Sequence, residues 1–283
     1  MSDPVDVCSF GSAHEWYLQY IKRTDPVAMR NEHYHSFYEV YYMLSGSRLY
    51  FIRDRSYTVE QGDLVFIHKY ELHKTMPNGQ PEHERILLHF TDESLRQYAG
   101  EMAELLLSPF HAPSHVFRLP AGLQLDADAL FRRMLHEVRT EEPGFQLLIR
   151  QGMTELLLIV ARYLRSHEPA PFRHASSIHA KISEVTSYIN ANYREPLRLE
   201  SVSKEHFISP HYLSRMFKQI TGFAFTDYIA ITRMKEAERL LKESTDSISS
   251  IAGQVGYDNF SHFGKTFKRV TGLSPREYRR DMS

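Results

Sequence analysis

Residues 248–279 read ISSIAGQVGYDNFSHFGKTFKRVTGLSPREYR, and this stretch decides the fold of the C-terminal part of the chain. Apolar residues recur at helical spacing from Ile248 to Val255. Gly256 and Tyr257 then supply a turn before a second helix with the same periodicity. A helix, a tight turn containing glycine and another helix together predict a helix-turn-helix unit.

The unit occurs twice. FKRVTG at residues 267–272 repeats FKQITG at residues 217–222, which lies 50 positions earlier. In the first copy, Ser209 is a favoured N-cap residue and Pro210 a favoured first helical residue. We therefore expect two helix-turn-helix units joined by a helix over residues 227–243.

The second helix of each unit has an apolar and a polar face. In the first unit the apolar face follows the spacing of a buried stripe and comprises Leu213, Met216, Phe217 and Ile220. The polar face could also be an ordinary solvated surface, but the repeat favours DNA, since arginine can read base edges and lysine can neutralise phosphates. Arg215 and Lys265 are the leading candidates for DNA contact. The full set is His211, Ser214, Arg215, Lys218, Ser261, Lys265 and Lys268.

This region resembles the AraC/XylS family of transcription regulators. The resemblance lies in I-A-x-x-V-G-Y, F-x-x-x-F-K-R-x-x-G and S-P-x-x-Y-R, all within residues 248–279. It covers residues 178–283 and implies an all-helical DNA-binding domain of seven helices. The first unit departs from the family at Ser203 and His206, where alanine and an apolar residue are usual. In the second unit His262 stands where tyrosine is frequent, and we expect it to have a core or stacking role.

The composition indicates a globular chain of two domains. Its 283 residues are 42% hydrophobic and 24% charged, which excludes disorder. The single cysteine, Cys8, excludes an intrachain disulfide and a Cys-rich zinc module. No secretory signal or membrane span is predicted, so we expect a cytoplasmic location without membrane contact. The net charge of −1 combines +4 in residues 176–283 with −5 before them, which is compatible with DNA binding at the C-terminal end.

Short β-rich runs occupy residues 30–90. The runs FYEVYYML, RLYFI, LVFI and RILLHF are separated by turn signals at Ser45-Gly46, RDRS and QGD. This pattern predicts a compact antiparallel barrel or sandwich. Helical periodicity follows over residues 94–107, 126–140 and 145–166. The predicted fold class is therefore α+β and multidomain, with an N-terminal β-barrel and flanking helices before the all-α part.

Segment 166–177, SHEPAPFRHASS, is predicted to be a linker because prolines and small polar residues discourage helix. We therefore expect a sensor and dimerisation domain over residues 1–165 and a DNA-binding domain over residues 178–283. The apolar surface of residues 145–166 is too wide for an isolated helix. It either packs on the barrel or, as the family resemblance implies, forms the interface of a homodimer.

Polar residues are also expected inside the barrel. In an extended chain His33, His35 and Glu39 point to one face, which Tyr41 shares. Together with His73 they resemble the cupin fold, in which two histidines and a glutamate from one motif and a histidine from the next surround a metal. The proline and glycine usual before the last histidine are absent here, where the chain has His68 and Tyr70.

Three interpretations of this cluster stay open. His33, His35, Glu39, Tyr41 and His73 could line a pocket for an organic effector. The same histidines and Glu39 could hold a divalent metal, since imidazole and carboxylate suit zinc, iron, nickel or manganese. They could also be purely structural. No other cofactor is indicated.

The sequence thus predicts a transcription regulator, as activator or repressor, and not an enzyme. A small-molecule effector, with sugars and their derivatives common in this architecture, would change how a homodimer engages operator DNA or RNA polymerase. The alternatives are a metal-responsive regulator, a metal-dependent cupin enzyme with an accessory helical domain, and a DNA-binding protein whose barrel serves only in assembly.

Overall fold

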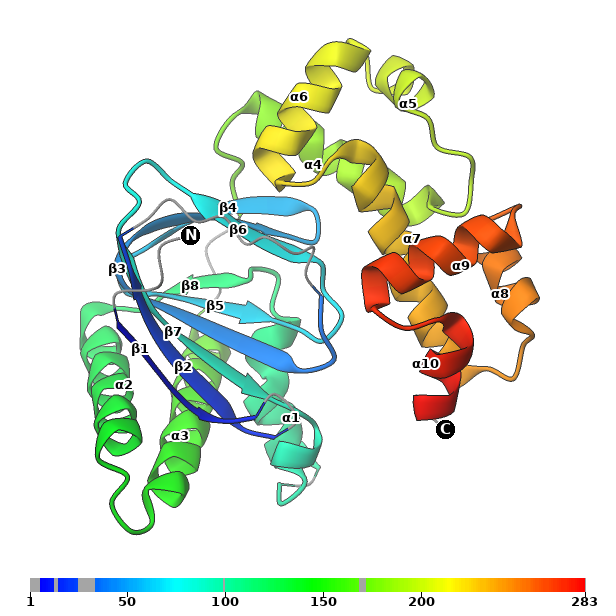
Figure 1. The fold of residues 1–283 in the computed structure, drawn as a ribbon. Coiled ribbons are helices and arrows are strands. Elements are labelled where there is room, and N and C mark those ends of the chain that lie inside the picture. Colours follow the sequence, from blue (N-terminus) through cyan, green and yellow to red (C-terminus); the bar gives the residue numbers. More distant parts are fainter. Residues whose placement is uncertain (1–5, 13–14, 25–33, 99, 168–171, 283) are drawn as a thin grey trace. The chain divides into compact units, whose positions relative to one another are not determined.

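The computed structural model describes residues 6–12, 15–24, 34–98, 100–167 and 172–282 (Figure 1). They form two compact units, and the chain passes for the last time from the first to the second between Arg173 and His174, because Arg53–Ser56 also group with the second unit. The first unit combines a β-sheet with helices, and the second is helical. None of the helices in these ranges is long and apolar enough to cross a bilayer.

The first unit is built on an eight-stranded sheet whose main path runs β1-β2-β7-β3-β5-β8, while β4 and β6 pair with β3. Neighbours along this path are antiparallel, as the alternation of short apolar runs and turns predicted. The strands are β1 (Asp6–Gly11), β2 (Tyr17–Arg23), β3 (Tyr38–Ile52), β4 (Arg55–Glu60), β5 (Asp63–Ile67), β6 (His73–Pro77), β7 (His83–Phe90) and β8 (Val116–Arg118).

β3 continues through Ser45-Gly46, so the turn predicted there is wrong. The register with β7 shifts between Met43 and Ser45, which makes this position a β-bulge. Gly46 has a left-handed φ of +89°, and a Cβ added to it would lie 2.5 Å from the carbonyl oxygen of Glu82. Glycine is therefore needed for the close approach of β3 and β7. Ser45 and Gly46 still pair with β7, and from Arg48 onwards β3 pairs with β6 instead of β5 and β7.

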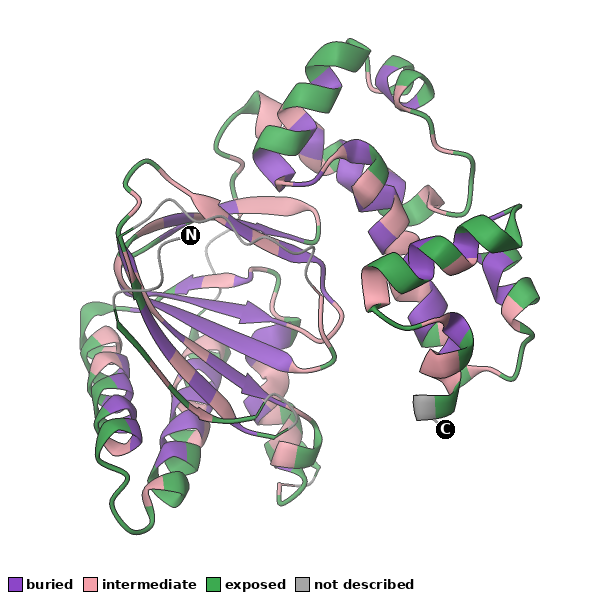
Figure 2. Cartoon of the chain, in the orientation of Figure 1, coloured by how far each residue is buried: buried purple, intermediate pink, exposed green. Residues whose placement is uncertain are grey.

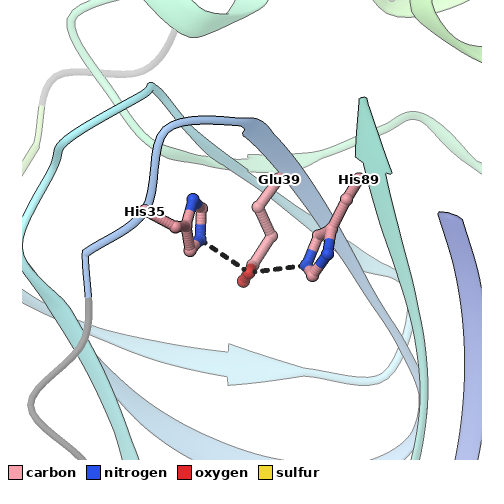
Figure 3. Close-up of side chains that lie close together, drawn as sticks. All are labelled: His35, Glu39 and His89. Carbon is pink, nitrogen blue, oxygen red and sulfur yellow. Dashed lines mark hydrogen bonds and ion pairs between the residues drawn. The ribbon is translucent and has the colours of Figure 1, made fainter. Parts of the chain in front are cut away.

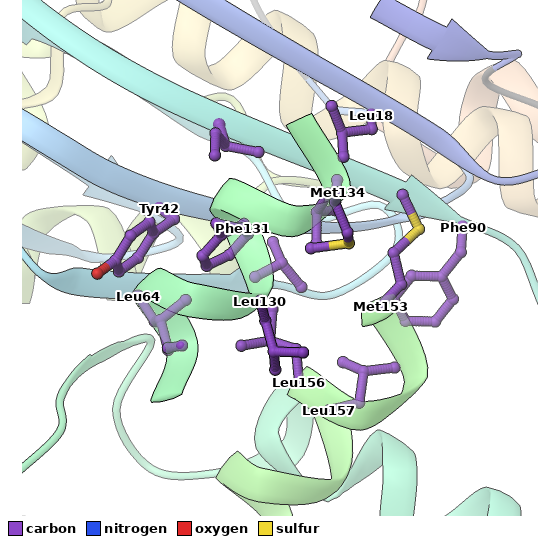
Figure 4. Close-up of a cluster of buried hydrophobic side chains, with 14 of the residues drawn as sticks. Leu18, Tyr42, Leu64, Phe90, Leu130, Phe131, Met134, Met153, Leu156 and Leu157 are labelled. Atoms are coloured by element: carbon purple, nitrogen blue, oxygen red, sulfur yellow. The ribbon is translucent and has the colours of Figure 1, made fainter. Parts of the chain in front are cut away.

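Side chains alternate along β3 and separate two cores. Tyr38, Val40 and Tyr42 belong to the larger core, which lies between the sheet and two helices, α2 (Ala121–Thr140) and α3 (Phe145–Ser166) (Figure 4). The opposite face of the sheet carries a smaller core, here called the inner core. Its buried members are Tyr41, Met43, Tyr50, Ile52, Tyr57, Val59, Val65 and Ile67.

The helices differ from the expected ranges mainly at their starts. The segment predicted as one helix over residues 94–107 contains a short 3-10 helix, η1 (Glu93–Leu95), and α1 (Glu101–Leu107), and a second 3-10 helix, η2 (Ser108–His111), follows. α2 begins five residues before the expected 126, whereas α3 has the predicted bounds. The wide apolar surface of α3 is largely explained by packing within its own unit, since Met153, Leu156, Leu157 and Val160 are buried in the larger core.

The described part of the second unit contains seven helices, the number that the family resemblance implied. α7 is central and contacts α6, α8, α9 and α10, and α6, α7 and α9 each combine buried with exposed residues (Figure 2). The helices are α4 (Ser177–Asn192), α5 (Leu199–Glu205), α6 (Pro210–Thr221), α7 (Phe225–Glu243), α8 (Ile248–Gln254), α9 (Phe260–Thr271) and α10 (Pro275–Met282).

The sequence repeat corresponds to a repeat of local structure in α6 and α9. At the start of α6 the Ser209 hydroxyl accepts a hydrogen bond from the Tyr212 N–H, and at the start of α9 the Asn259 side chain accepts one from the His262 N–H. Both helices end at a glycine in the left-handed region, Gly222 and Gly272. The two sequence copies therefore begin and end their helices in the same way.

Candidate functional site

The polar face of α6 is exposed along its whole length. His211, Ser214, Arg215 and Lys218 are exposed, whereas Leu213, Phe217 and Ile220 are buried and Met216 is half-buried. The Arg215 guanidinium lies 5.4 Å from the ring centroid of Tyr212, within cation–π range. Tyr212 was not among the expected contact residues, although its place one turn before Arg215 puts it on the same face.

α9 presents a matching surface. Ser261, Lys265 and Lys268 are exposed on one side, and Phe263 and Phe267 are buried on the other. His262 is exposed rather than buried, so a core role is wrong. Its ring centroid lies 5.3 Å from that of Tyr257, and the two rings meet edge to face rather than stacked.

Arg233 of α7 ties the two helix-turn-helix units together. Its Nε donates to the carbonyl oxygen of Tyr193 and its Nη2 to that of Glu195, both at 2.7 Å, so it holds the loop that precedes α5. The same guanidinium lies 5.3 Å from the ring centroid of Tyr257, in the turn that precedes α9. One side chain of α7 thus contacts the loop before α5 and the turn before α9.

The two departures from the family pattern have different consequences. Ser203 is buried, and its hydroxyl donates to the carbonyl oxygen of Glu200 at 2.9 Å, so it leaves no polar group unsatisfied. His206 packs its ring edge-on against Tyr188, but its buried Nε2 has no hydrogen-bond partner in the described structure. Of the two departures, only His206 therefore lowers stability, because it buries a ring nitrogen that makes no hydrogen bond in the described structure.

In the first unit, Glu39 is the centre of a buried polar cluster (Figure 3). Its Oε2 lies 3.1 Å from the Nε2 of His35 and 3.1 Å from the Nε2 of His89, and both imidazoles donate to it. The Tyr50 hydroxyl donates to Oε1 at 3.1 Å. His89 stands directly opposite Glu39 in the pairing of β3 with β7, so the strand register brings them together.

These bonds determine the charge of the cluster. Burial alone raises the pKa of Glu39, but the hydrogen bonds from His35 and His89 and the charge of His73 outweigh it and hold this pKa well below its usual value. Burial lowers the pKa of His89, against the attraction of Glu39. A neutral His89 that donates from Nε2 keeps a lone pair on Nδ1, which is buried and has no hydrogen-bond partner among the described residues.

The predicted barrel residues converge only in part. His73 is buried at the start of β6, with its Nε2 3.9 Å from the Oε2 of Glu39, and Tyr41 lies in the inner core. His33 lies outside the described residues. Sequence reasoning missed His89, although the strand HERILLHF places polar residues on one face and Ile86, Leu88 and Phe90 on the other.

The donor set His35, Glu39 and His89 is compatible with a divalent metal. One ligand atom from each lies within 4.8 Å of the others. Two imidazole nitrogens and a carboxylate oxygen are ligands that zinc accepts, and atoms about 3 Å apart can share a metal at bonds of about 2.1 Å. Of the expected ligands, this set contains His35 and Glu39, and it includes His89 as a ligand that was not expected.

Comparison with known proteins connects both sites to one family. Residues 15–157 match the model described as an AraC-like ligand binding domain, and residues 202–281 match a helix-turn-helix domain. The chain is 23% identical over 248 residues to the HTH-type transcriptional activator RhaR of Shigella dysenteriae serotype 1, which covers 88% of this chain and 86% of that protein.

Two solved structures are also similar. The C-terminal domain of AraT, a response regulator from Geobacillus stearothermophilus, is 37% identical with a TM-score of 0.36, covering 38% of this chain and 88% of that one. ToxT from Vibrio cholerae O395 is 13% identical with a TM-score of 0.39, covering 95% of this chain and 98% of that one.

Proposed function

The chain belongs to the AraC family of transcription regulators, and we propose on this basis that a bound effector controls its binding to operator DNA. The effector is a sugar or sugar derivative. It binds on the inner face of the β-sheet, which is the face that carries the inner core, and controls how α6 and α9 engage the operator. The residues 1–165 would form the sensor and dimerisation domain, 166–177 the linker and 178–283 the DNA-binding domain. Membership also sets aside the alternative of a metal-dependent enzyme, since the family consists of transcription regulators.

One observation carries the DNA-binding proposal, namely that α6 and α9 expose matched polar faces within one compact unit. Arg215 and Lys265 occupy equivalent places in the two units. Two such helices can enter successive major grooves on one side of a duplex, about 34 Å apart. We assign base contact chiefly to Arg215, because a guanidinium can donate two hydrogen bonds to guanine.

The effector proposal is supported by the buried polar cluster around Glu39. A carboxylate, imidazoles and phenolic hydroxyls are groups that bind the hydroxyls of a sugar, and they lie on the face of the sheet opposite to α2 and α3. The proposed effector contacts are His33, His35, Glu39, Tyr41 and His73, to which His89 and Tyr50 are added.

We further propose that the chain acts as a homodimer, that it is an activator like the RhaR protein to which it is similar, and that it contacts RNA polymerase. Leu147 and Leu148 support the dimer, because these large apolar side chains are 60% and 41% exposed at the start of α3.

DNA binding is tested with alanine variants of the leading residues. Operator sites are first located by genome-wide footprinting, and affinity is then measured by fluorescence anisotropy at fixed salt. Arg215→Ala and Lys265→Ala should each weaken operator binding about tenfold or more, since one good base contact contributes about 1–3 kcal/mol. Lys242→Ala removes an exposed charge at the end of α7 and serves as the control. Wild-type affinity in both variants would show that α6 and α9 are not the reading helices.

A metal-responsive regulator is the second candidate. It is favoured by the proximity of the ligand atoms of His35, Glu39 and His89. Elemental analysis of the purified protein decides between the two, because stoichiometric metal supports the metal-responsive form and its absence rejects it.

A further inference from the structure

A second polar group lies on the same inner face, at the other end of β3 and β7. Arg85 stands between Ile21 of β2 and Met43 of β3, and two residues along β7 His83 stands between Arg23 and Gly46. Arg48 follows Gly46 by two residues on β3. The register of three strands therefore gathers three arginines and a histidine at one end of the sheet.

Arg85 points into the inner core. Its guanidinium lies 5.7 Å from the ring centroid of Tyr41, and its Nη2 donates to the Oε1 of Gln19 at 3.3 Å. Arg85 is half-buried, and its Nη1 is buried with no hydrogen-bond partner among the described residues. Within the described ranges, no carboxylate lies at ion-pair distance from this side chain. A half-buried guanidinium with one unsatisfied buried nitrogen gains from an acidic partner, so the arrangement favours an anion that completes it.

The neighbouring groups increase the positive potential around Arg85. Arg48 is 2% exposed. Burial lowers the pKa of His83 to about 4, and the charges of Arg48, Arg85 and Arg23 act in the same direction. The Nδ1–H of His83 donates to the carbonyl oxygen of Pro81 at 3.1 Å. The end of the sheet around Arg85 therefore repels further protons and attracts anions.

The two polar groups are held at a fixed separation. Arg85 faces Met43, and His89 faces Glu39. The first pair therefore lies four residues from the second along both strands, which is about 13 Å. Between them lie Leu87 and Tyr41, which offer an apolar floor. The Arg85 guanidinium lies 5.7 Å from the ring centroid of Tyr41, so this side chain extends over the floor from one end.

We propose that the effector is a sugar acid, whose anionic group pairs with Arg85 while its hydroxyls bind at Glu39 and Tyr50. This inference rests on the proposed function, because it takes the inner face as the effector site and adds the charge of the ligand. A carboxylate and a phosphate share the chemistry that a guanidinium recognises, and the planar fork of arginine matches both.

The test measures thermal unfolding of the full chain with and without small molecules. The chain has a single tryptophan, Trp16, which is 5% exposed in the larger core of the first unit, so its fluorescence reports that unit. Galacturonate and gluconate are compared with galactose and glucitol at equal ionic strength, and glucose 6-phosphate with glucose. We expect one acid or phosphate to raise the midpoint by about 3 °C or more while its neutral partner does not.

Three variants locate the effect. Arg85→Met should weaken binding of the stabilising anion about tenfold to a hundredfold, because a charge-assisted pair is lost. Arg85→Lys keeps the positive charge but lacks the planar guanidinium, and its affinity for the anion should fall less than that of Arg85→Met. Lys22→Met removes an exposed cation of β2 that pairs with Glu84, and should bind like the wild type.

The outcomes separate this inference from the proposed function. If neutral sugars stabilise the first unit and Arg85→Met retains the effect, the effector function stands and the anion inference is overturned. The anion inference is equally overturned if an anion stabilises Arg85→Met as much as the wild type. If no compound of either charge moves the midpoint, the anion inference fails together with the sensor function, while the operator measurements on Arg215→Ala still report DNA binding separately.

Discussion

Among single residues, Glu39 shows how hydrogen bonds stabilise a negative charge in the interior of the protein. Three donors surround its carboxylate, and each sits on a different segment: His35 before β3, Tyr50 beyond the bulge of β3, and His89 on β7. Because the pKa of Glu39 is depressed in the folded chain, its contribution to stability is present above its ordinary pKa of about 4.3 and is lost as the pH falls further.

His83 predicts a loss of stability in milder acid. Its folded pKa of about 4 lies below the ordinary value of about 6.5, so between these values the unfolded chain binds the proton first. Stability contributed by neutral His83 is therefore fully present above pH 6.5 and decreases towards pH 4, by at most about 1.4 kcal/mol per pH unit. Urea unfolding followed by Trp16 fluorescence should show this slope, and His83→Gln should flatten it.

The matched control is His136→Gln, which removes an exposed histidine from α2 in the same unit. It should keep the wild-type slope. Identical pH profiles for the wild type and His83→Gln between pH 6.5 and 4 would mean that another group is responsible.

The residues of the cluster differ in how far the sequence could predict them. His35 and Glu39 lie four residues apart, so spacing alone placed them together. His89 is 50 residues from Glu39, and only the register of β7 against β3 makes them neighbours. No local pattern encodes such a pairing, which is why the polar residues of β7 gave no sign that one of them belongs to the cluster.

At the level of elements, local signals predicted the helical unit well and β3 less well. α6 and α9 carry their own caps, periodicity and terminal glycines, so each could be located from a short window. Ser45-Gly46 has the residues of a turn, but a glycine with positive φ also suits a bulge. Which one forms depends on the start of β7, where His83 and the preceding Glu82 approach Gly46 closely.

Gly256 allows a prediction about the joint between the two helix-turn-helix units. It has a φ of +87°, and an added Cβ would lie 2.5 Å from the carbonyl oxygen of Arg194. Gly256→Ala should therefore push the loop before α5 away from Arg233. We expect a loss of about 1–2 kcal/mol in stability, seen as a lower midpoint by far-ultraviolet circular dichroism, and about tenfold weaker operator binding.

Gly253→Ala is the control, because an added Cβ at this helical position meets nothing within 4 Å. Alanine is the better helix former, so this variant should be neutral or slightly stabilising. If the two alanine variants behave alike, the close approach at Gly256 does not matter for the joint.

For the whole molecule, two compact units with separate cores predict two measurable transitions. Trp16 fluorescence follows the first unit, while circular dichroism at 222 nm is dominated by helices, many of them in the second. Operator DNA should raise the circular-dichroism midpoint by several degrees and the Trp16 midpoint by less. Equal shifts of both midpoints would instead indicate that the chain unfolds as one cooperative body.

The continuous strand β3 has a consequence for ligand choice. Glu39 lies near its start and Arg48 near its end, and between them a bulge bends the strand without interrupting it. The rise per residue of a paired strand is nearly constant, so the strand fixes the distance between the two polar ends. A molecule with an anionic group and hydroxyls but of the wrong length would contact only one of the two polar ends. The protein would then select effectors by length without a conformational change.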